Sequence, residues 1–305
     1  VKEWLYQLLS PNKVVTRSPR SYNSQIGVPL SVWLLNEQTE VGVFEAGISE
    51  RGEMKALREI IQPTIGVFTS LGEAHQENFA SLEEKCMEKL CLFRDTNAIV
   101  YPLDEELVVH CIKTLNYKNT ILGWSKKDSN AALFVKEIKK AELTTTITYV
   151  WQQGKEASYT IPFIDDASVE NSITSAIICL HLGVEVKTLA ERMPLLEPVA
   201  MRLEVKEGQH GCTLINDSYN SDFNSLDIAL DFMNRRPDHK GRKRTLILSD
   251  IFQSGEDDET LYQRVAFLAE KRGMEKFIGI GEGLIRQRKA FNKFGKKYFF
   301  ATVGS

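Results

Sequence analysis

The sequence predicts an α/β protein with two domains, each built around a mainly parallel sheet. Its 305 residues exceed the usual size of one domain, and 43% of them are hydrophobic, enough for two cores. Short apolar runs alternate with segments of helical periodicity, which is typical of parallel sheets covered by helices. Two prolines, Pro194 and Pro198, interrupt this pattern, and it then restarts. We therefore predict a first domain over residues 1–197 and a second, truncated α/β domain over 198–305.

The first 130 residues show the alternation most clearly. The opening segment, residues 1–9, predicts a helix because Trp4, Leu5, Leu8 and Leu9 share one face. The apolar, strand-like runs that follow are 13–17, 40–45, 64–69, 98–101 and 120–122, and the helical segments between them are 28–35, 53–61, 82–93 and 105–115. This order predicts a parallel sheet with helices on both faces.

The pattern changes between residues 132 and 164. Three runs alternate polar with apolar residues and are rich in β-branched side chains: 133–138, 144–151 and 157–164. They predict a small antiparallel meander, with a turn at Gln153 and Gly154. A helix is then expected over 168–182, with Ser168 as its N-cap.

After the prolines, the second domain repeats the alternation. Strands are predicted at 203–206, 213–216, 245–248, 276–280 and 298–301, and helices at 224–234 and 259–272. This arrangement resembles half of a doubly wound sheet.

Composition excludes several classes of protein. The net charge of −3 gives no electrostatic case for binding nucleic acid or an anionic membrane. No apolar run approaches the length that spans a bilayer, and no signal-peptide pattern opens the chain. The five cysteines are odd in number and form no CxxC pair, which indicates free thiols in a reducing compartment. They are Cys86, Cys91, Cys111, Cys179 and Cys212.

Two polar residues follow neighbouring predicted strands. Glu45 ends an apolar strand and stands two residues before Gly47, and His75 follows the exit of the next strand. Ligands of open α/β sheets bind outside the carboxyl ends of the strands, and a carboxylate there can hold Mg²⁺ against a phosphate. The alternative is a solvent-facing acid and a surface histidine. If the site is real, we expect Glu45 and His75 within about 8 Å of each other.

Other motifs allow both a structural and a functional interpretation. The segment 216–220, which contains Asp217, Tyr219 and Asn220, offers groups that suit ribose and phosphate, but an Asx turn that caps the next helix is the simpler explanation. The segment 279–283 resembles a dinucleotide loop with incorrect spacing, so a tight strand-to-helix turn is favoured. The basic run 235–244 is interrupted by Pro237, Asp238 and Gly241, which favours a solvated loop. Lys89 lies on an amphipathic helix, where lysines usually face water.

Taken together and in this order, five segments of the chain resemble the Mur ligase family. They are 1–3 (VKE), 23–29 (NSQIGVP), 44–53 (FEAG with GE), the block from His75 to 89–93 (KLCLF), and 216–220 (NDSYN). The resemblance covers essentially the whole chain. It implies a central domain with a P-loop-NTPase-like parallel sheet and a Rossmann-like C-terminal domain.

The resemblance also implies an activity. Segments 26–29 and 217–220 favour the branch that adds D-alanyl-D-alanine to UDP-N-acetylmuramoyl-tripeptide during peptidoglycan precursor synthesis. Enzymes of this kind are cytoplasmic and use ATP and Mg²⁺. ATP phosphorylates the tripeptide carboxylate, and the amine of D-alanyl-D-alanine then attacks the acyl phosphate. Catalysis would rest on positioning and charge neutralisation.

Residue roles follow from the same resemblance. Glu45 and His75 match the metal-binding acid and histidine, and Lys89 matches a lysine that CO₂ converts to a carbamate, whose negative charge supports a second Mg²⁺. Nucleotide-binding residues are matched by Asn171, Arg202, Asp217, Tyr219 and Asn220. Asn23 matches a position near the substrate.

The chain departs from the family pattern at several points. No phosphate-binding loop ending in Gly-Lys-Thr/Ser is present, nor is the domain that binds the UDP group; we expect both before Val1. A His-Asn pair is replaced by Ala167 and Ser168, an acid by Cys91, the Asn-x-Asp motif by 102–104 (PLD), and the Asp-Met-x-Glu-Leu-Gly motif by 250–255 (DIFQSG). These changes indicate a divergent subgroup. Some divergent relatives carry a fused alanine racemase domain, which would lie beyond Ser305.

Two other hypotheses remain. The chain could be a sister ligase with another acceptor, such as a folylpolyglutamate synthase-like enzyme. It could also be a ligase-like binding module without enzymatic activity. The sequence upstream of Val1 would distinguish them, because a UDP-binding domain there favours the first hypothesis.

Overall fold

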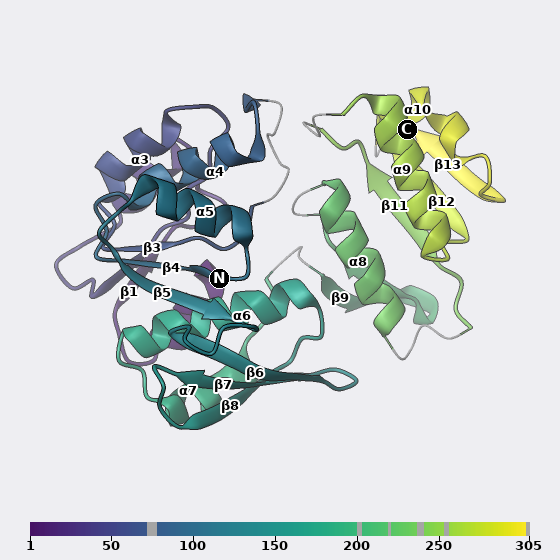
Figure 1. The fold of residues 1–305 in the computed structure, drawn as a ribbon. Coiled ribbons are helices and arrows are strands. Elements are labelled where there is room, and N and C mark those ends of the chain that lie inside the picture. The colour runs from purple at the N-terminus through teal and green to yellow at the C-terminus, as the bar shows by residue number, and fades with distance from the viewer. Residues whose placement is uncertain (72–77, 200–202, 219–220, 237–240, 253–255, 303–305) are drawn as a thin grey trace. The chain divides into compact units, whose positions relative to one another are not determined.

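The computed structural model describes residues 1–71, 78–199, 203–218, 221–236, 241–252 and 256–302. These residues divide into two compact units, which Figure 1 colours from purple to teal and from green to yellow. The first unit comprises the described residues up to Glu197, and the second begins at Pro198. We describe each unit by itself.

One six-stranded sheet organises the first unit. Its strands lie in the order β3-β4-β5-β6-β7-β8. Pairing is parallel from β3 to β6 and antiparallel from β6 to β8. The strands are β3 (Ile65–Val67), β4 (Ala98–Pro102), β5 (Thr120–Ser125), β6 (Leu133–Lys140), β7 (Thr145–Trp151) and β8 (Glu156–Ile161). The predicted meander therefore extends the parallel sheet. A separate parallel pair is formed by β1 (Val15–Arg17) and β2 (Val41–Val43).

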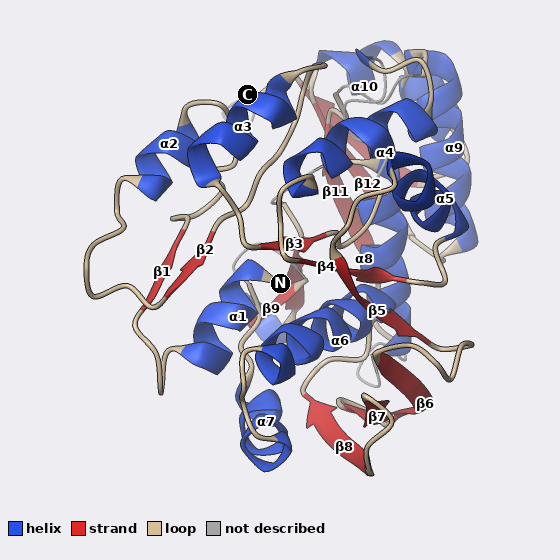
Figure 2. Cartoon of the chain, turned by 60° about the vertical axis from the view of Figure 1, so that its left-hand side comes forward, coloured by secondary structure: helices blue, strands red, loops and turns tan. Residues whose placement is uncertain are grey.

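Helices cover both faces of the parallel strands, as Figure 2 shows. Ala98 and Val100 of β4 belong to a core that includes α1 (Lys2–Leu9) and α6 (Asp166–His181). The alternate residues, Ile99 and Tyr101, pack with α4 (Leu82–Leu90), the 3₁₀ turn η2 (Cys91–Phe93) and α5 (Glu106–Leu115). This two-residue alternation is the geometry of a strand buried on both faces. A smaller cluster joins α2 (Gly27–Val32) to α3 (Glu53–Ile61).

Two local predictions in this unit were wrong in detail. The N-cap of α6 is Asp165 and not Ser168: Asp165 Oδ1 accepts a hydrogen bond from the Ser168 amide at 2.7 Å. The turn between β7 and β8 is centred on Gln152 and Gln153, whose φ angles are +46° and +57°. Positive φ at both central residues matches the twist of a two-residue hairpin, so the turn lies one residue earlier than predicted. The unit ends with α7 (Val186–Arg192) and η3 (Met193–Leu195).

The second unit contains two sheets. Strands β11 (Thr245–Ser249), β12 (Lys276–Ile280) and β13 (Lys296–Phe300) form a parallel sheet. Strands β9 (Glu204–Glu207) and β10 (Thr213–Asn216) pair antiparallel across η4 (Gln209–Gly211) and so depart from the expected βα alternation. The helical segments are α8 (Phe223–Arg235), α9 (Asp258–Lys271), α10 (Glu282–Arg286) and η6 (Arg288–Phe291). Their core centres on stacked Phe277 and Phe291 rings.

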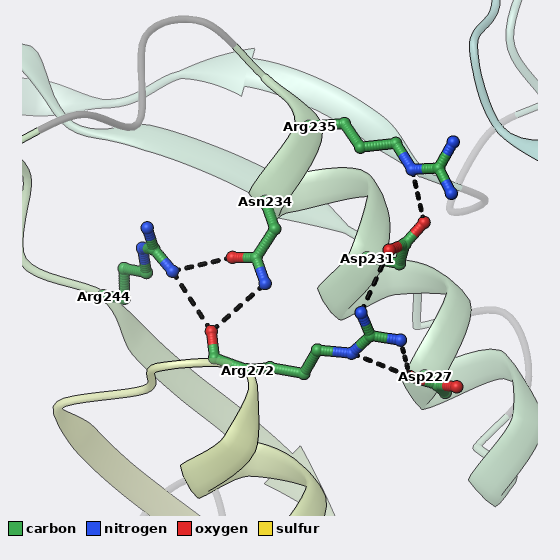
Figure 3. Close-up of polar contacts among 6 residues, drawn as sticks. All are labelled: Asp227, Asp231, Asn234, Arg235, Arg244 and Arg272. Atoms are coloured by element: carbon green, nitrogen blue, oxygen red, sulfur yellow. Dashed lines mark hydrogen bonds and ion pairs between the residues drawn. The ribbon is translucent and has the colours of Figure 1, made fainter.

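A polar cluster connects α8 to the end of α9 (Figure 3). Arg272 donates to Asp227 through Nε and to Asp231 through Nη1, both at 3.0 Å. The carbonyl of Arg272 accepts from Asn234 at 3.2 Å and from Arg244 at 3.1 Å. The side chain therefore ties two helices together while its carbonyl, at the end of α9, is satisfied by other side chains.

Within the described residues, no helix combines the length and the apolar character needed to cross a membrane.

Candidate active site

Glu45 and Asn23 meet where β2 ends. The carboxylate Oε1 of Glu45 accepts a hydrogen bond from Asn23 Nδ2 at 3.2 Å. The backbone amide of Gly47 donates to the Asn23 carbonyl at 2.8 Å, and a Cβ at Gly47 would lie only 3.2 Å from Asn23 Nδ2. The glycine in this motif therefore permits the close approach of the two segments. The Glu45 amide donates to the buried Ser18 hydroxyl at 3.1 Å.

A second cationic side chain reaches the same carboxylate from the start of α1. Lys2 Nζ lies 3.7 Å from Glu45 Oε2. Because Asn23 contacts one oxygen and Lys2 the other, the orientation of the carboxyl group is defined. The group remains 38% exposed on its side chain, so it is still accessible to a ligand.

Lys89 lies in the last turn of α4 and is partly buried. Burial lowers the pKa of its amine below the ordinary 10.5, while Cys86 and Glu45 act in the opposite direction. The influence of Glu45 on this pKa brings Lys89 into electrostatic range of the Glu45 carboxylate. Among the described residues it forms no hydrogen bond or ion pair. Lys89 is therefore not a solvated surface lysine.

Several predicted site residues lie outside the described part of the chain. They are His75, Arg202, Tyr219 and Asn220. The expected distance between Glu45 and His75 stays a prediction for the same reason.

Asn171 lies on α6 beside a polar cluster that sequence reasoning mostly missed. Asp104, which follows β4, accepts hydrogen bonds from the Ser125 hydroxyl at 2.6 Å and the Lys126 amide at 2.8 Å. Lys126 in turn pairs with Glu170 Oε1 at 2.8 Å. We had noted Asp104 only as a departure from a motif. Because the strand prediction stopped at residue 122, the polar residues after β5 gave no signal as strand-end groups.

Asp217 follows β10 and has a defined partner. Its Oδ1 accepts from the Leu203 amide at 3.1 Å, and Leu203 has φ +48°, an unusual value for a branched residue. The Asn216 side chain accepts from the Ser218 amide at 3.3 Å, which is an Asx turn. The turn does not cap the next helix, because the N-cap of α8 is Asp222.

The glycine-rich segment 279–283 is a turn with its amides already occupied. Both oxygens of Asp250 accept from it, at 2.9 Å from the Gly283 amide and 2.8 Å from the Leu284 amide. Gly281 has φ +131°, and a Cβ there would lie 2.3 Å from the Asp250 carboxyl group. The segment therefore requires glycine for its own geometry and presents no free phosphate cradle.

The donor set suits a magnesium ion shared with phosphates. In the described residues, no three His, Cys, Asp or Glu side chains cluster as a metal site. Glu45 supplies one accessible carboxylate, and Mg²⁺ commonly binds through one or two carboxylates together with substrate phosphates and water. Lys89 as an amine would repel a cation, and fits only after conversion to an anion.

Comparison with known proteins assigns the family. Residues 1–179 match the model of the Mur ligase middle domain. The chain belongs to the Mur ligase family.

Relatives within the family are more distant. The UDP-N-acetylmuramoyl-tripeptide–D-alanyl-D-alanine ligase of Bacillus subtilis is 25% identical over 92% of this chain and 60% of its own length. The ligase of that name from Buchnera aphidicola is 26% identical over 98% of this chain and 65% of its own. This chain therefore spans roughly three fifths of these relatives.

Solved structures show the same fold. MurF from Acinetobacter baumannii superposes with a TM-score of 0.84 at 20% identity, over 99% of this chain and 65% of its own. MurF ligase from Thermotoga maritima in complex with ADP gives 0.75 at 19% identity, over 99% and 73%. The predicted architecture, a mostly parallel central sheet followed by a C-terminal α/β unit, is confirmed.

Proposed function

We propose that the complete protein is an ATP-dependent ligase that adds D-alanyl-D-alanine to UDP-N-acetylmuramoyl-tripeptide. The family membership supports an amide-forming ligase, and the names of the relatives support this acceptor. The observation that carries the proposal is the meeting of Glu45 with Asn23 at the exit of β2, within electrostatic range of Lys89. The reaction would serve peptidoglycan precursor synthesis in the cytoplasm.

In this proposal, ATP phosphorylates the terminal carboxylate of the tripeptide and leaves as ADP. The amine of D-alanyl-D-alanine then attacks the acyl carbon, loses a proton, and expels phosphate as the amide forms. Mg²⁺, when bound, would neutralise the charge of the phosphates. Glu45 would hold it, together with His75. The hydrogen bond from Asn23 would keep the Glu45 carboxylate oriented, and Asn23 would lie near the substrate.

Lys89 would act as a carbamate. Its uncharged amine attacks CO₂, a proton is released, and the side chain becomes an anion. The lowered pKa of Lys89 favours this step, because a larger fraction of the amine is uncharged at neutral pH. The product would support a second Mg²⁺ where the ammonium group would repel it.

The nucleotide would be held by residues from both parts of the chain. Asn171 would contact adenine, next to the ion pair of Lys126 with Glu170. Arg202, Asp217, Tyr219 and Asn220 would contact the nucleotide from the second domain. We propose residues 1–197 and 198–305 as these two domains. A fused alanine racemase domain stays a prediction.

A sister ligase has less support. Folylpolyglutamate synthase from L. casei superposes with a TM-score of 0.61 at 12% identity, below the values for the MurF structures. No feature of the described residues favours a module without activity.

The test is a ligase assay on the complete gene product. We expect UDP-tripeptide, D-alanyl-D-alanine and Mg-ATP to yield UDP-pentapeptide and one ADP per bond formed, and Glu45→Gln to reduce kcat by at least a hundredfold. Single amino acids offered in place of the dipeptide serve as the control. Amide formation with glutamate and a folate, but none with the dipeptide, would assign the chain to a sister enzyme.

A further inference from the structure

Lys2 is the point where three separate segments of the first unit are joined. Its ammonium group donates to the Ser18 carbonyl at 2.9 Å and also to the Arg20 carbonyl. It forms ion pairs with Glu45 Oε2 at 3.7 Å and with Glu3 Oε1 at 3.3 Å. The side chain is only 10% exposed. A surface lysine has no need of this geometry, because water would satisfy its three donors.

The segment that Lys2 holds has an unfavourable backbone. Arg20 is an exposed residue with φ +46°, in the left-handed region. For a residue with a Cβ this conformation costs roughly 1–2 kcal/mol and persists only where surrounding contacts impose it. The hydrogen bond from Lys2 to the Arg20 carbonyl is a contact that can do so.

The same segment carries both hydrogen bonds that fix the chain around Glu45. Ser18 accepts from the Glu45 amide, and the Asn23 carbonyl accepts from the Gly47 amide. Release of the Arg20 backbone would therefore disturb the backbone on either side of Glu45. It would also move the Asn23 amide away from the carboxylate.

We propose that Lys2 is a positioning residue of the active site. It holds residues 18–23 in their strained conformation and thereby keeps Asn23 and Glu45 together before substrate binds. The consequence for catalysis rests on the proposed function, whereas the consequence for the backbone does not. Lys2 touches no reacting atom in this proposal; it acts through the segment it anchors and through the charge it places beside Glu45.

The backbone consequence is tested by hydrogen exchange in the complete protein, with the segment 45–47 as the reporter. We expect Lys2→Met to accelerate its exchange at least tenfold. Adding Arg20→Gly should restore at least threefold of this, because glycine adopts positive φ without strain. Lys55→Met is the matched control: Lys55 is an exposed lysine of α3, and its loss should leave the segment unchanged.

The catalytic consequence is measured on the same variants. We expect Lys2→Met to lower kcat at least tenfold, and Arg20→Gly in that background to recover part of the loss. A merely stabilising lysine would show no such recovery by a glycine elsewhere. Should Lys2→Met fail to fold, Lys2→Arg replaces it: the planar guanidinium keeps the charge but not the compact geometry, and exchange should rise at least threefold.

The outcomes separate the two proposals. Exchange at wild-type rate in Lys2→Met or Lys2→Arg overturns the positioning role, whatever the activity. Faster exchange without recovery by Arg20→Gly overturns the strain argument on which the role depends. An inactive wild-type protein that still shows the exchange pattern leaves the positioning of Glu45 intact and contradicts only the ligase function.

Discussion

Lys89 is a cationic side chain that is partly buried next to a carboxylate it does not contact. Such a position has an energetic cost, because burial disfavours the charged form of the amine. Its cost is understandable if the side chain serves a reaction. Function and stability should therefore respond in opposite directions when Lys89 is replaced.

We expect Lys89→Ala to lower ligase activity far more than Lys55→Ala, an exposed lysine of α3. A small carboxylate such as acetate or formate should restore part of the activity, because an anion is what the site lacks. Steady-state rates with and without the carboxylate check this. Full activity in the Lys89→Ala enzyme would rule out the carbamate.

Stability offers an independent measurement. The folded-state pKa of Lys89 lies below its ordinary 10.5, so the unfolded chain binds more protons and this group favours folding increasingly as pH rises toward 10.5. In CO₂-depleted buffer, Lys89→Met should therefore be at least as stable as wild type at pH 7. Its advantage should shrink by pH 10. Thermal melts at the two pH values test this, and a less stable variant at pH 7 would contradict it.

At the scale of elements, the caps and ties of helices decide which side chains are structural. Helix α6 passes through the first core and carries Asn171, so its starting point sets the position of a proposed nucleotide contact. Asp165 provides the cap, and Ser168 only donates its amide to it.

Asp165→Ala should cost about 1 kcal/mol of unfolding free energy, a typical value for the loss of an N-cap. Ser168→Ala keeps the amide that is capped and should cost about half of that or less. Urea unfolding at neutral pH compares the two. An equal or larger loss for Ser168→Ala would return the cap to the serine.

The cluster of Figure 3 is a second tie between elements. Asp227 is the main cause of the raised pKa of Arg272, and the guanidinium is 27% exposed. Arg272→Met should cost about 1–2 kcal/mol, because several charge-assisted hydrogen bonds are lost and Asp227 is left without this partner. The loss should exceed that of Arg286→Met, whose pair with Asp258 is 63% exposed and screened by solvent. Equal unfolding free energies of the two variants would contradict this.

At the scale of the molecule, residues 1–305 provide two cores but no phosphate cradle. The sequence contains no Gly-Lys-Thr/Ser loop, and the glycine-rich turn at 279–283 is occupied by Asp250. A loop of that kind supplies the amides and the lysine that hold the phosphates of ATP. Glu45 and Lys2 cannot replace it.

We therefore expect residues 1–305, expressed alone, to fold and yet to bind Mg-ATP too weakly to measure at micromolar protein. Isothermal calorimetry provides the measurement, and the complete gene product is the control. Micromolar affinity of residues 1–305 for ATP would reveal a nucleotide site that does not depend on such a loop.

The sequence alone determined the features that depend on local order. Alternation along β4 and helical spacing in α1 predicted both elements, because these patterns record which side of each element is buried. The polar exit of β2 singled out Glu45 for the same reason. Tertiary structure alone decided the rest. Asp250 fills a turn some thirty residues away, Lys2 anchors a segment beyond a helix and a strand, and Lys89 is partly buried beside Glu45. Contacts between residues so distant in the chain leave no periodic pattern, so only the folded protein reveals them.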